Sequence, residues 1–189
     1  FIDKFGSDFY ENPATYFPDV EIGSAHAQDR ADEMAVRAVQ VLKPNADFFP
    51  LPHPEAPMLV VLMKPFSTPL DPTEQPLADA IRAQFPRARY EEVSELTHPA
   101  ELDAILEVAA KYQQVVVAPI VKPAAWHRFG LKPHHQAFVE AIVRQQPVVL
   151  ASLGSPQLFA MVPEATVHLC AFSDMAPSQR ALAKVLATG

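Results

Sequence analysis

Two side chains of this sequence could act as nucleophiles, Ser155 and Cys170. A serine hydrolase places its serine in a sharp G-x-S-x-G turn. Ser155 instead precedes Pro156, which is typical of a helix cap followed by a proline at the first helical position. Cys170 is the single cysteine and stands in the apolar run 167–172, so we expect a buried, inert thiol and no internal disulfide. A hydrolase using either residue remains the weakest of three alternatives.

The histidines and acids do not form a recognisable site either. His134 and His135 are adjacent, so on a helix their side chains point about 100° apart and do not readily share one ion. Because the sequence has no H-E-x-x-H motif and no cysteine cluster, we predict surface or capping histidines and no metal. Glycoside hydrolysis uses two carboxylates. Asp71 and Asp174 both look like helix-start residues, and no acid pair stands out.

Cofactors and charged polymers are also disfavoured. Phosphate-binding loops need glycine so that backbone amides can approach the anion, but the loop 64–70 has prolines and no glycine. We therefore expect no nucleotide, flavin or other cofactor. The net charge of −7 argues against nucleic acid or an anionic membrane as partner. No run of 18 apolar residues predicts a membrane span.

The loop 121–132 has the best candidates for binding. It is long, and it contains the only tryptophan, Trp126, followed by His127 and Arg128. An aromatic ring beside hydrogen-bonding groups can hold a sugar or a neighbouring protein surface. These three residues are our candidates for substrate-binding or interdomain contacts. The alternative is that Trp126 packs the loop onto the sheet edge.

Strands and helices alternate along most of the chain, with many of the 20 prolines between them. This order predicts a three-layer α/β/α sandwich with an open, mostly parallel, flavodoxin-like sheet. In such sheets ligands bind outside the carboxyl ends of the strands, where the loops 64–70, 121–132, 153–155 and 173–176 fall. Residues 1–23 are rich in aromatics and form a separate strap, and residues 24–189 form the domain. The predicted strands cover residues 58–63, 88–93, 114–120, 147–152 and 166–172. The predicted helices cover residues 24–43, 71–85, 97 onward, 133 or 134 onward, 155 onward and 177–186.

Two segments then resemble a known family. The first is Gly23-Ser24-x-His26, then the helix, Val39-Gln40-Val41-Leu42-Lys43 and Phe49-Pro50-Leu51. The second runs from Pro147 to Pro156, followed by Cys170-Ala171-Phe172-Ser173-Asp174 and Ser178-Gln179-Arg180-Ala181. Together they resemble the C-terminal domain of family 3 glycoside hydrolases, especially the β-N-acetylhexosaminidase branch.

The resemblance implies a parent enzyme with an N-terminal (β/α)8 barrel that holds the catalytic residues and binds the carbohydrate. No lysine-histidine-phenylalanine-proline-glycine motif occurs here, so no catalytic residue is carried over. Residues 1–23 would be the connection from the barrel, and the chain alone is expected to be inactive. The other alternative is a free-standing flavodoxin-like module that binds a small molecule or a protein. The cytoplasm is slightly favoured as the compartment.

Overall fold

The computed structural model describes residues 23–65, 74–122 and 130–189. The chain divides into two units, Phe1–Ala31 and Asp32–Gly189. In the first unit the described residues include the start of helix α4 (Ala25–Ala38). Here Ser24 Oγ accepts a hydrogen bond from the Ala27 amide at 3.3 Å, which confirms the predicted helix cap.

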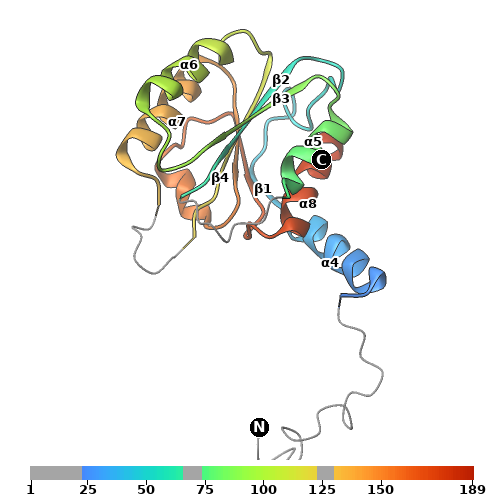
Figure 1. Ribbon diagram of the computed structural model, residues 1–189. Helices are drawn as coiled ribbons and strands as arrows, with labels where there is room; N and C mark the ends of the chain where they lie inside the picture. The colour runs from blue at the N-terminus through green and yellow to red at the C-terminus, as the bar shows by residue number, and fades with distance from the viewer. Residues whose placement is uncertain (1–22, 66–73, 123–129) are drawn as a thin grey trace, which may run out of the picture. The chain divides into compact units, whose positions relative to one another are not determined.

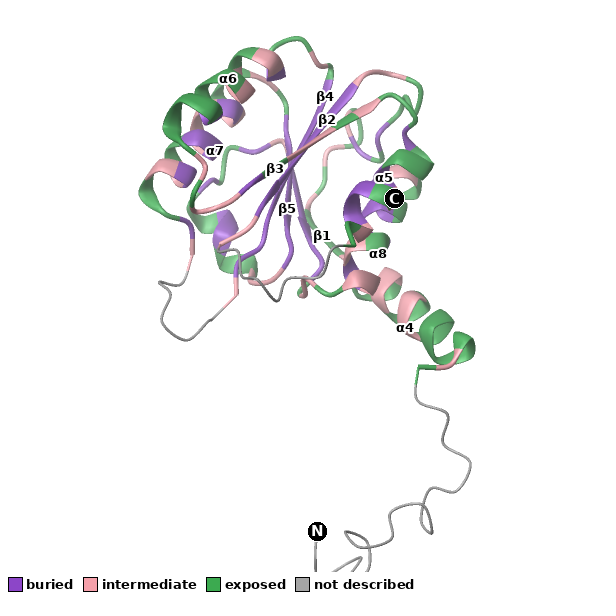
Figure 2. Ribbon diagram, in the orientation of Figure 1, coloured by how far each residue is buried: buried purple, intermediate pink, exposed green. Residues whose placement is uncertain are grey.

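The second unit contains a six-stranded sheet in the order β1-β6-β5-β4-β2-β3 (Figure 1). Every neighbouring pair is parallel except β1 and β6. The strands β2 and β4 are buried along their whole length, as expected for central strands covered on both faces (Figure 2). The strands are β1 (Gln40–Lys43), β2 (Met58–Met63), β3 (Ala88–Val93), β4 (Gln114–Pro119), β5 (Val149–Ser152) and β6 (Val167–Cys170).

Helices cover both faces of the sheet and make it the middle of three layers (Figure 1). Helices α5 (Pro76–Gln84) and α8 (Ala176–Thr188) pack on the face that contains Val60 and Leu62. Helices α6 (Pro99–Ala109) and α7 (Pro133–Gln145) pack on the opposite face, together with the 3-10 helix η1 (Pro156–Ala160). Two apolar cores result, and each fully buried leucine or valine contributes about 1.5–3 kcal/mol. The predicted three-layer architecture is confirmed.

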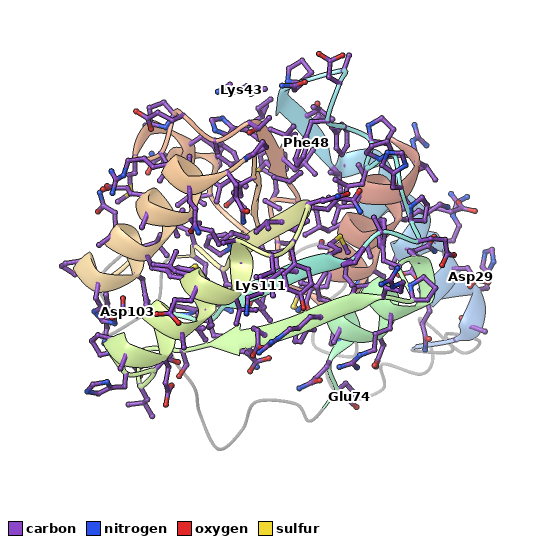
Figure 3. The ribbon with its side chains drawn as sticks, turned by 90° about the horizontal axis from the view of Figure 1, so that it is seen from above. Asp29, Lys43, Phe48, Glu74, Asp103 and Lys111 are labelled. Atoms are coloured by element: carbon purple, nitrogen blue, oxygen red, sulfur yellow. The ribbon has the colours of Figure 1, made fainter. Side chains whose placement is uncertain are left out.

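The predicted helix over residues 24–43 is wrong in its second part. Helix α4 ends at Ala38, and residues 40–43 form the edge strand β1, antiparallel to β6. Lys43, which is labelled in Figure 3, holds this strand in place. Its Nζ donates to the carbonyl oxygens of Pro163 at 2.8 Å and Ala165 at 2.7 Å. A four-residue strand at a sheet edge has too little alternation to be told from the last turn of a helix.

The predicted helix start at residues 71–74 also needs correction. Residues 71–73 lie outside the described part of the chain, whereas Glu74 and Gln75 are described and are not helical. Helix α5 begins at Pro76, with Gln75 as its N-terminal flanking residue. Pro72 and Pro76 could each stand in the first turn of a helix, and the helix begins at Pro76, which directly precedes the buried Leu77.

The strand order determines where a ligand is expected. From β2 the chain moves outward to β3, and then crosses back over β2 to β4. In open α/β sheets, ligands bind outside the carboxyl ends of the strands where the order reverses, which here lies between β2 and β4. Among the described residues, no helix is long and apolar enough to cross a bilayer.

Candidate functional site

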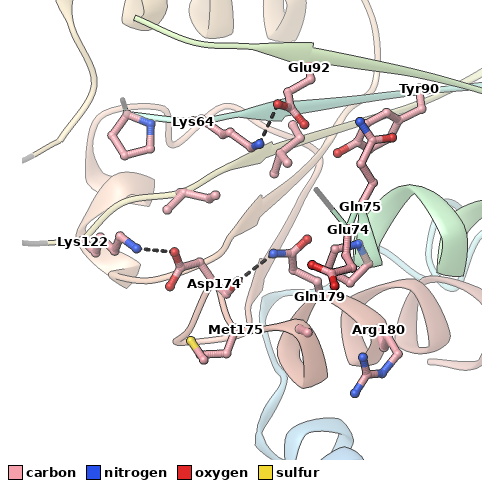
Figure 4. A pocket seen from close by; sticks show the side chains of 15 residues that line it. Lys64, Glu74, Gln75, Tyr90, Glu92, Lys122, Asp174, Met175, Gln179 and Arg180 are labelled. Atoms are coloured by element: carbon pink, nitrogen blue, oxygen red, sulfur yellow. Dashed lines mark hydrogen bonds and ion pairs between the residues drawn. The ribbon is translucent and has the colours of Figure 1, made fainter. Parts of the chain in front are cut away.

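A cavity of about 670 Å³ lies at this position (Figure 4). Its walls come from the carboxyl ends of β2, β3 and β4 and from the first residues of α5 and α8. Three of the four strand-end loops predicted from the sequence contribute described residues to it: Lys64 and Pro65 from the first, Lys122 from the second, and Asp174, Met175 and Ala176 from the third. The volume is within the range of about 300–1,000 Å³ that is usual for small-molecule sites.

One wall of the cavity holds an ion pair between Lys64, just after β2, and Glu92, near the end of β3. Their Nζ and Oε1 atoms are 2.6 Å apart, and the side chains are 25% and 29% exposed. The pair links two neighbouring parallel strands in register, since Leu62 lies opposite Glu92. Its contribution to stability is modest, at about 0–1 kcal/mol for a solvent-accessible pair.

A second ion pair joins Lys122, after β4, to Asp174, just before α8. Asp174 was predicted to begin a helix. It does stand at the start of α8, but its side chain binds Lys122, and Met175 is the residue that flanks the helix. The Asp174 carboxylate therefore orients a cation in the cavity and does not cap the helix.

Gln179 connects the two helices that border the cavity. Its Oε1 accepts a hydrogen bond from the Leu77 amide of α5 at 3.2 Å. Its Nε2 donates to the carbonyl oxygen of Asp174 at 2.7 Å. Gln75 makes no side-chain cap on α5, so Gln179 satisfies an amide in the first turn that would otherwise lack a partner.

The deep wall of the cavity is apolar and aromatic. Leu62 and Ile120 are buried, and the Tyr90 ring stands beside them. The guanidinium carbon of Arg82 lies 6.0 Å from the centre of the Tyr90 ring. Burial raises the pKa of Tyr90, and the Glu92 carboxylate raises it further, so the phenol stays neutral at physiological pH.

Two large apolar side chains are exposed between β6 and α8. Met175, which lines the cavity, is 67% exposed, and Phe172, shortly after the end of β6, is 50% exposed. Phe172 also has a positive φ of 57°. Such a conformation is uncommon for a bulky residue and costs of order 1 kcal/mol or more. An exposed phenylalanine held in this conformation is a candidate for contact with another surface.

The ends of β5 and β6 are closely packed. Gly154, with φ 152°, passes so close to the Val121 carbonyl that a Cβ atom would clash with it. The Ser152 hydroxyl donates to the carbonyl oxygen of Ser155 at 2.7 Å, and the Cys170 thiol donates to that of Gly154 at 3.4 Å. The fourth predicted loop, residues 153–155, therefore fills this half of the edge and does not line the cavity.

The two candidate nucleophiles lie in that packed half. Ser155 Oγ accepts a hydrogen bond from the Gln157 amide at 3.2 Å, which confirms the predicted cap on η1. Cys170 is fully buried, as predicted, and burial raises the pKa of its thiol. A thiol with a raised pKa forms less thiolate and is a poorer nucleophile.

The interpretation of all histidines as surface or capping residues is wrong for two of them. His98 does cap α6, since its Nδ1 accepts from the Ala100 amide. His135 is 2% exposed, with its Nε2 3.0 Å from the Ser94 carbonyl oxygen, and His168 is 7% exposed and stacks on Phe159. Burial lowers the pKa of both rings. Over the described residues, no group of three or more His, Cys, Asp or Glu side chains could hold a metal ion.

The predicted contact residues Trp126, His127 and Arg128 lie outside the described residues, as does Asp71. Sequence reasoning missed the residues that do form the cavity wall, above all Lys64, Glu92 and Gln179. A signal for Lys64 was present, because Lys64 directly follows the continuous apolar strand β2, as Lys122 closely follows β4. Glu92 and Gln179 stand inside a strand and a helix, where the sequence pattern alone does not distinguish them from solvent-exposed residues.

The fold resembles that of several solved structures. The chain matches a glycoside hydrolase family 3 β-N-acetylglucosaminidase from Paenibacillus sp. with a TM-score of 0.72 and 16% identity, over 89% of this chain and 32% of that one. The fold is that of a domain of family 3 enzymes. A β-glucosidase from Listeria innocua matches with a TM-score of 0.71 and 15% identity, over 98% of this chain and 29% of the enzyme.

A fungal multi-domain family 3 β-N-acetylglucosaminidase matches with a TM-score of 0.69 and 13% identity, over 89% of this chain and 19% of that one. The chain thus spans about a third or less of each of these family 3 enzymes. No protein-family model and no curated protein matches the sequence. The matches to solved structures confirm the family resemblance of the sequence at the level of fold.

Proposed function

We propose that this chain is an accessory domain of a family 3-like glycoside hydrolase of the β-N-acetylhexosaminidase type. It would act in the hydrolysis of O-glycosidic bonds as the partner of a (β/α)8 barrel in the same polypeptide. The observation that carries the proposal is the fold match, which covers 89–98% of this chain but only 19–32% of three family 3 enzymes. A catalytic barrel would account for much of the remaining length.

The chemistry of the described residues supports a dependent role. Ser155 is engaged as a helix cap, and the Cys170 thiol is buried with a raised pKa. In the cavity, the Glu92 and Asp174 carboxylates each pair with a lysine. Both carboxylates are thus engaged by a cation of this chain, which suits groups that orient or bind. The groups that cleave the glycosidic bond would come from the barrel.

The surface that meets the barrel is proposed from two observations. Phe172 and Met175 expose apolar surface between β6 and α8, and Phe172 keeps an unfavourable backbone conformation. Trp126, His127 and Arg128 belong to a loop that follows the neighbouring strand β4. We place these residues in the contact with the barrel or with its sugar. Residues 1–23 would be the connection between the two domains.

The test starts from the complete polypeptide that contains this chain. A barrel of about 250 residues in the same reading frame is expected, with hydrolysis of aryl N-acetyl-β-glucosaminides. Trp126→Ala should lower kcat/KM or weaken the association of the separated domains by about tenfold, as is common for a buried aromatic contact. Trp126→Phe is the matched control and should retain most of both. Unchanged activity and association in Trp126→Ala would remove Trp126 from the contact, and a reading frame without a barrel would refute the proposal.

A second candidate function is a free-standing small-molecule binding module. The cavity favours it, because a space of about 670 Å³ stands at the position where open α/β sheets bind ligands. A start codon immediately before Phe1, together with ligand binding in the absence of any other domain, would support this function over the first.

A further inference from the structure

Both signs of charge are present around the cavity. Among the described residues that line it, three side chains are cationic and three are anionic: Lys64, Lys122 and Arg180, and Glu74, Glu92 and Asp174. Arg180 also binds outward to Asp32, with its Nη2 2.6 Å from Oδ1 and its Nε 3.1 Å from Oδ2.

The ion pairs retain capacity for further hydrogen bonds. A lysine ammonium has three N–H donors, and a carboxylate can accept about four hydrogen bonds. The bond between Lys64 and Glu92 uses one donor and one of the acceptor positions. In Figure 4 this pair and the pair of Lys122 with Asp174 lie at separate places around the cavity. At the pair of Lys64 and Glu92, both signs of charge can therefore meet a ligand.

The presence of both signs of charge selects among classes of ligand. A ligand with a net negative charge would face Glu92 and Asp174, and one with a net positive charge would face Lys64 and Lys122. An uncharged ligand would cover the ion pairs and desolvate them, at a cost of several kcal/mol for each ion when burial is complete. A ligand with both charges offsets that cost best, because hydrogen bonds between charged groups are about twice as strong as neutral ones.

We propose that this cavity binds a small zwitterion of the amino-acid or dipeptide class. Its carboxylate would be bound by Lys64 or Lys122, and its ammonium by Glu92 or Glu74. An apolar side chain of the ligand would pack on Leu62, Ile120 and the Tyr90 ring, which form the buried wall. This site is a property of the domain itself and does not depend on the proposed glycosidase parent.

The test measures binding to the purified 189-residue chain by isothermal titration calorimetry with four ligands of similar size. Glycyl-leucine carries both charges, N-acetylglycyl-leucine only the negative one, glycyl-leucinamide only the positive one, and cellobiose neither. We expect saturable binding of glycyl-leucine. Removing either charge should weaken affinity by about tenfold or more, the factor that corresponds to 1.4 kcal/mol.

Two neighbouring acids on β3 provide a matched pair of variants. Glu92→Gln removes a carboxylate from the cavity, whereas Glu91→Gln removes one that pairs with Arg89 at 2.6 Å and does not line the cavity. Glu92→Gln should weaken glycyl-leucine binding by about fivefold or more, and Glu91→Gln by less than about twofold. Circular dichroism of both variants would verify that they are folded.

Three results would overturn the zwitterion site. These are no binding of glycyl-leucine at 10 mM, on the order of the weakest useful affinity, equal binding of all three peptide forms, and tighter binding of cellobiose. Each result leaves the glycosidase proposal unaffected, because that proposal is tested by the activity of the complete polypeptide. Conversely, a reading frame without a barrel would leave the binding measured here unchanged.

Discussion

The carboxyl edge of the sheet has two halves that are built from different side chains. At the ends of β2, β3 and β4, long charged residues such as Lys64 and Glu92 surround a cavity of about 670 Å³. At the ends of β5 and β6, small residues such as Gly154 let the backbone approach Val121, and the space is filled. The same strand-end geometry therefore yields a binding surface in one half and core packing in the other, according to side-chain length.

The packed half should be the more sensitive to a single added methyl group. Gly154→Ala would force a Cβ atom against the Val121 carbonyl at φ 152°, so the backbone must shift. We expect the free energy of unfolding to fall by about 3 kcal/mol, measured by urea denaturation. Gly130→Ala is the control, because its φ of 95° is strained but no atom of the described residues stands within 4 Å of the new atom. It should cost about 1 kcal/mol, and equal losses in the two variants would contradict the close packing at Gly154.

Acid should lower the free energy of unfolding of the domain, because two of its histidines are buried. His135 bonds to Ser94 at the end of β3, and His168 stands on β6. Burial lowers the pKa of each ring below its ordinary value of 6.5 in the folded chain, with neighbouring His134 and Lys43 adding to the effect. The unfolded chain then binds protons first as the pH falls.

Stability is consequently complete above about pH 6.5 and is lost as the pH falls below that value. Urea denaturation between pH 7 and 5.5 should show a decrease of up to about 1 kcal/mol for each histidine. The variant His135→Gln/His168→Gln should have a flatter pH dependence, whatever its absolute stability. A wild-type stability that stays constant over this range would contradict neutral buried rings.

The cavity half should respond to the loss of Gln179. Gln179→Ala leaves the Leu77 amide and the Asp174 carbonyl without their side-chain partner, which should lower the free energy of unfolding by about 1–2 kcal/mol. The control is Gln136→Ala, which removes a half-buried bond to Glu140 within one helix, α7, and should cost less than about 0.5 kcal/mol. Equal effects of the two changes would show that Gln179 does not join α5 to α8.

The smallest effect is expected at Phe172, and it should be stabilising. Phe172→Gly relieves the positive φ of 57° and removes a half-exposed ring, so the isolated chain should gain about 0.5–1 kcal/mol in thermal or urea unfolding. If the ring contacts a partner domain, the same change should weaken domain association. A loss of stability in the isolated chain would mean that the ring packs within this domain.

The sequence predicted the central layers well because the signals there are strong and local. The runs Met58–Met63 and Ala88–Val93 have the predicted bounds, since apolar runs end at clear turn residues. Strand β1 was missed because its pairing partner β6 lies more than 120 residues away, and four edge residues carry no pattern of their own. Long-range pairing of this kind is absent from local periodicity.

The candidate site was predictable in its location but not in its composition. The rule for strand ends gave three of the four loops correctly, yet Lys64 and Glu92 meet only because β2 and β3 are in register. His135 was taken for a surface residue because its apolar surroundings come from other elements and from Ser94. Both the Lys64–Glu92 ion pair and the burial of His135 depend on residues that are distant in the sequence.

We propose that the bond-cleaving groups belong to a partner domain and that this domain contributes a surface and a cavity. The most direct measurement is the turnover of aryl N-acetyl-β-glucosaminides, aryl β-glucosides and aryl esters by the purified 189-residue chain. The account predicts no release of the aryl group above the buffer rate. Turnover that survives repurification and disappears in Ser155→Ala or Cys170→Ala would contradict it.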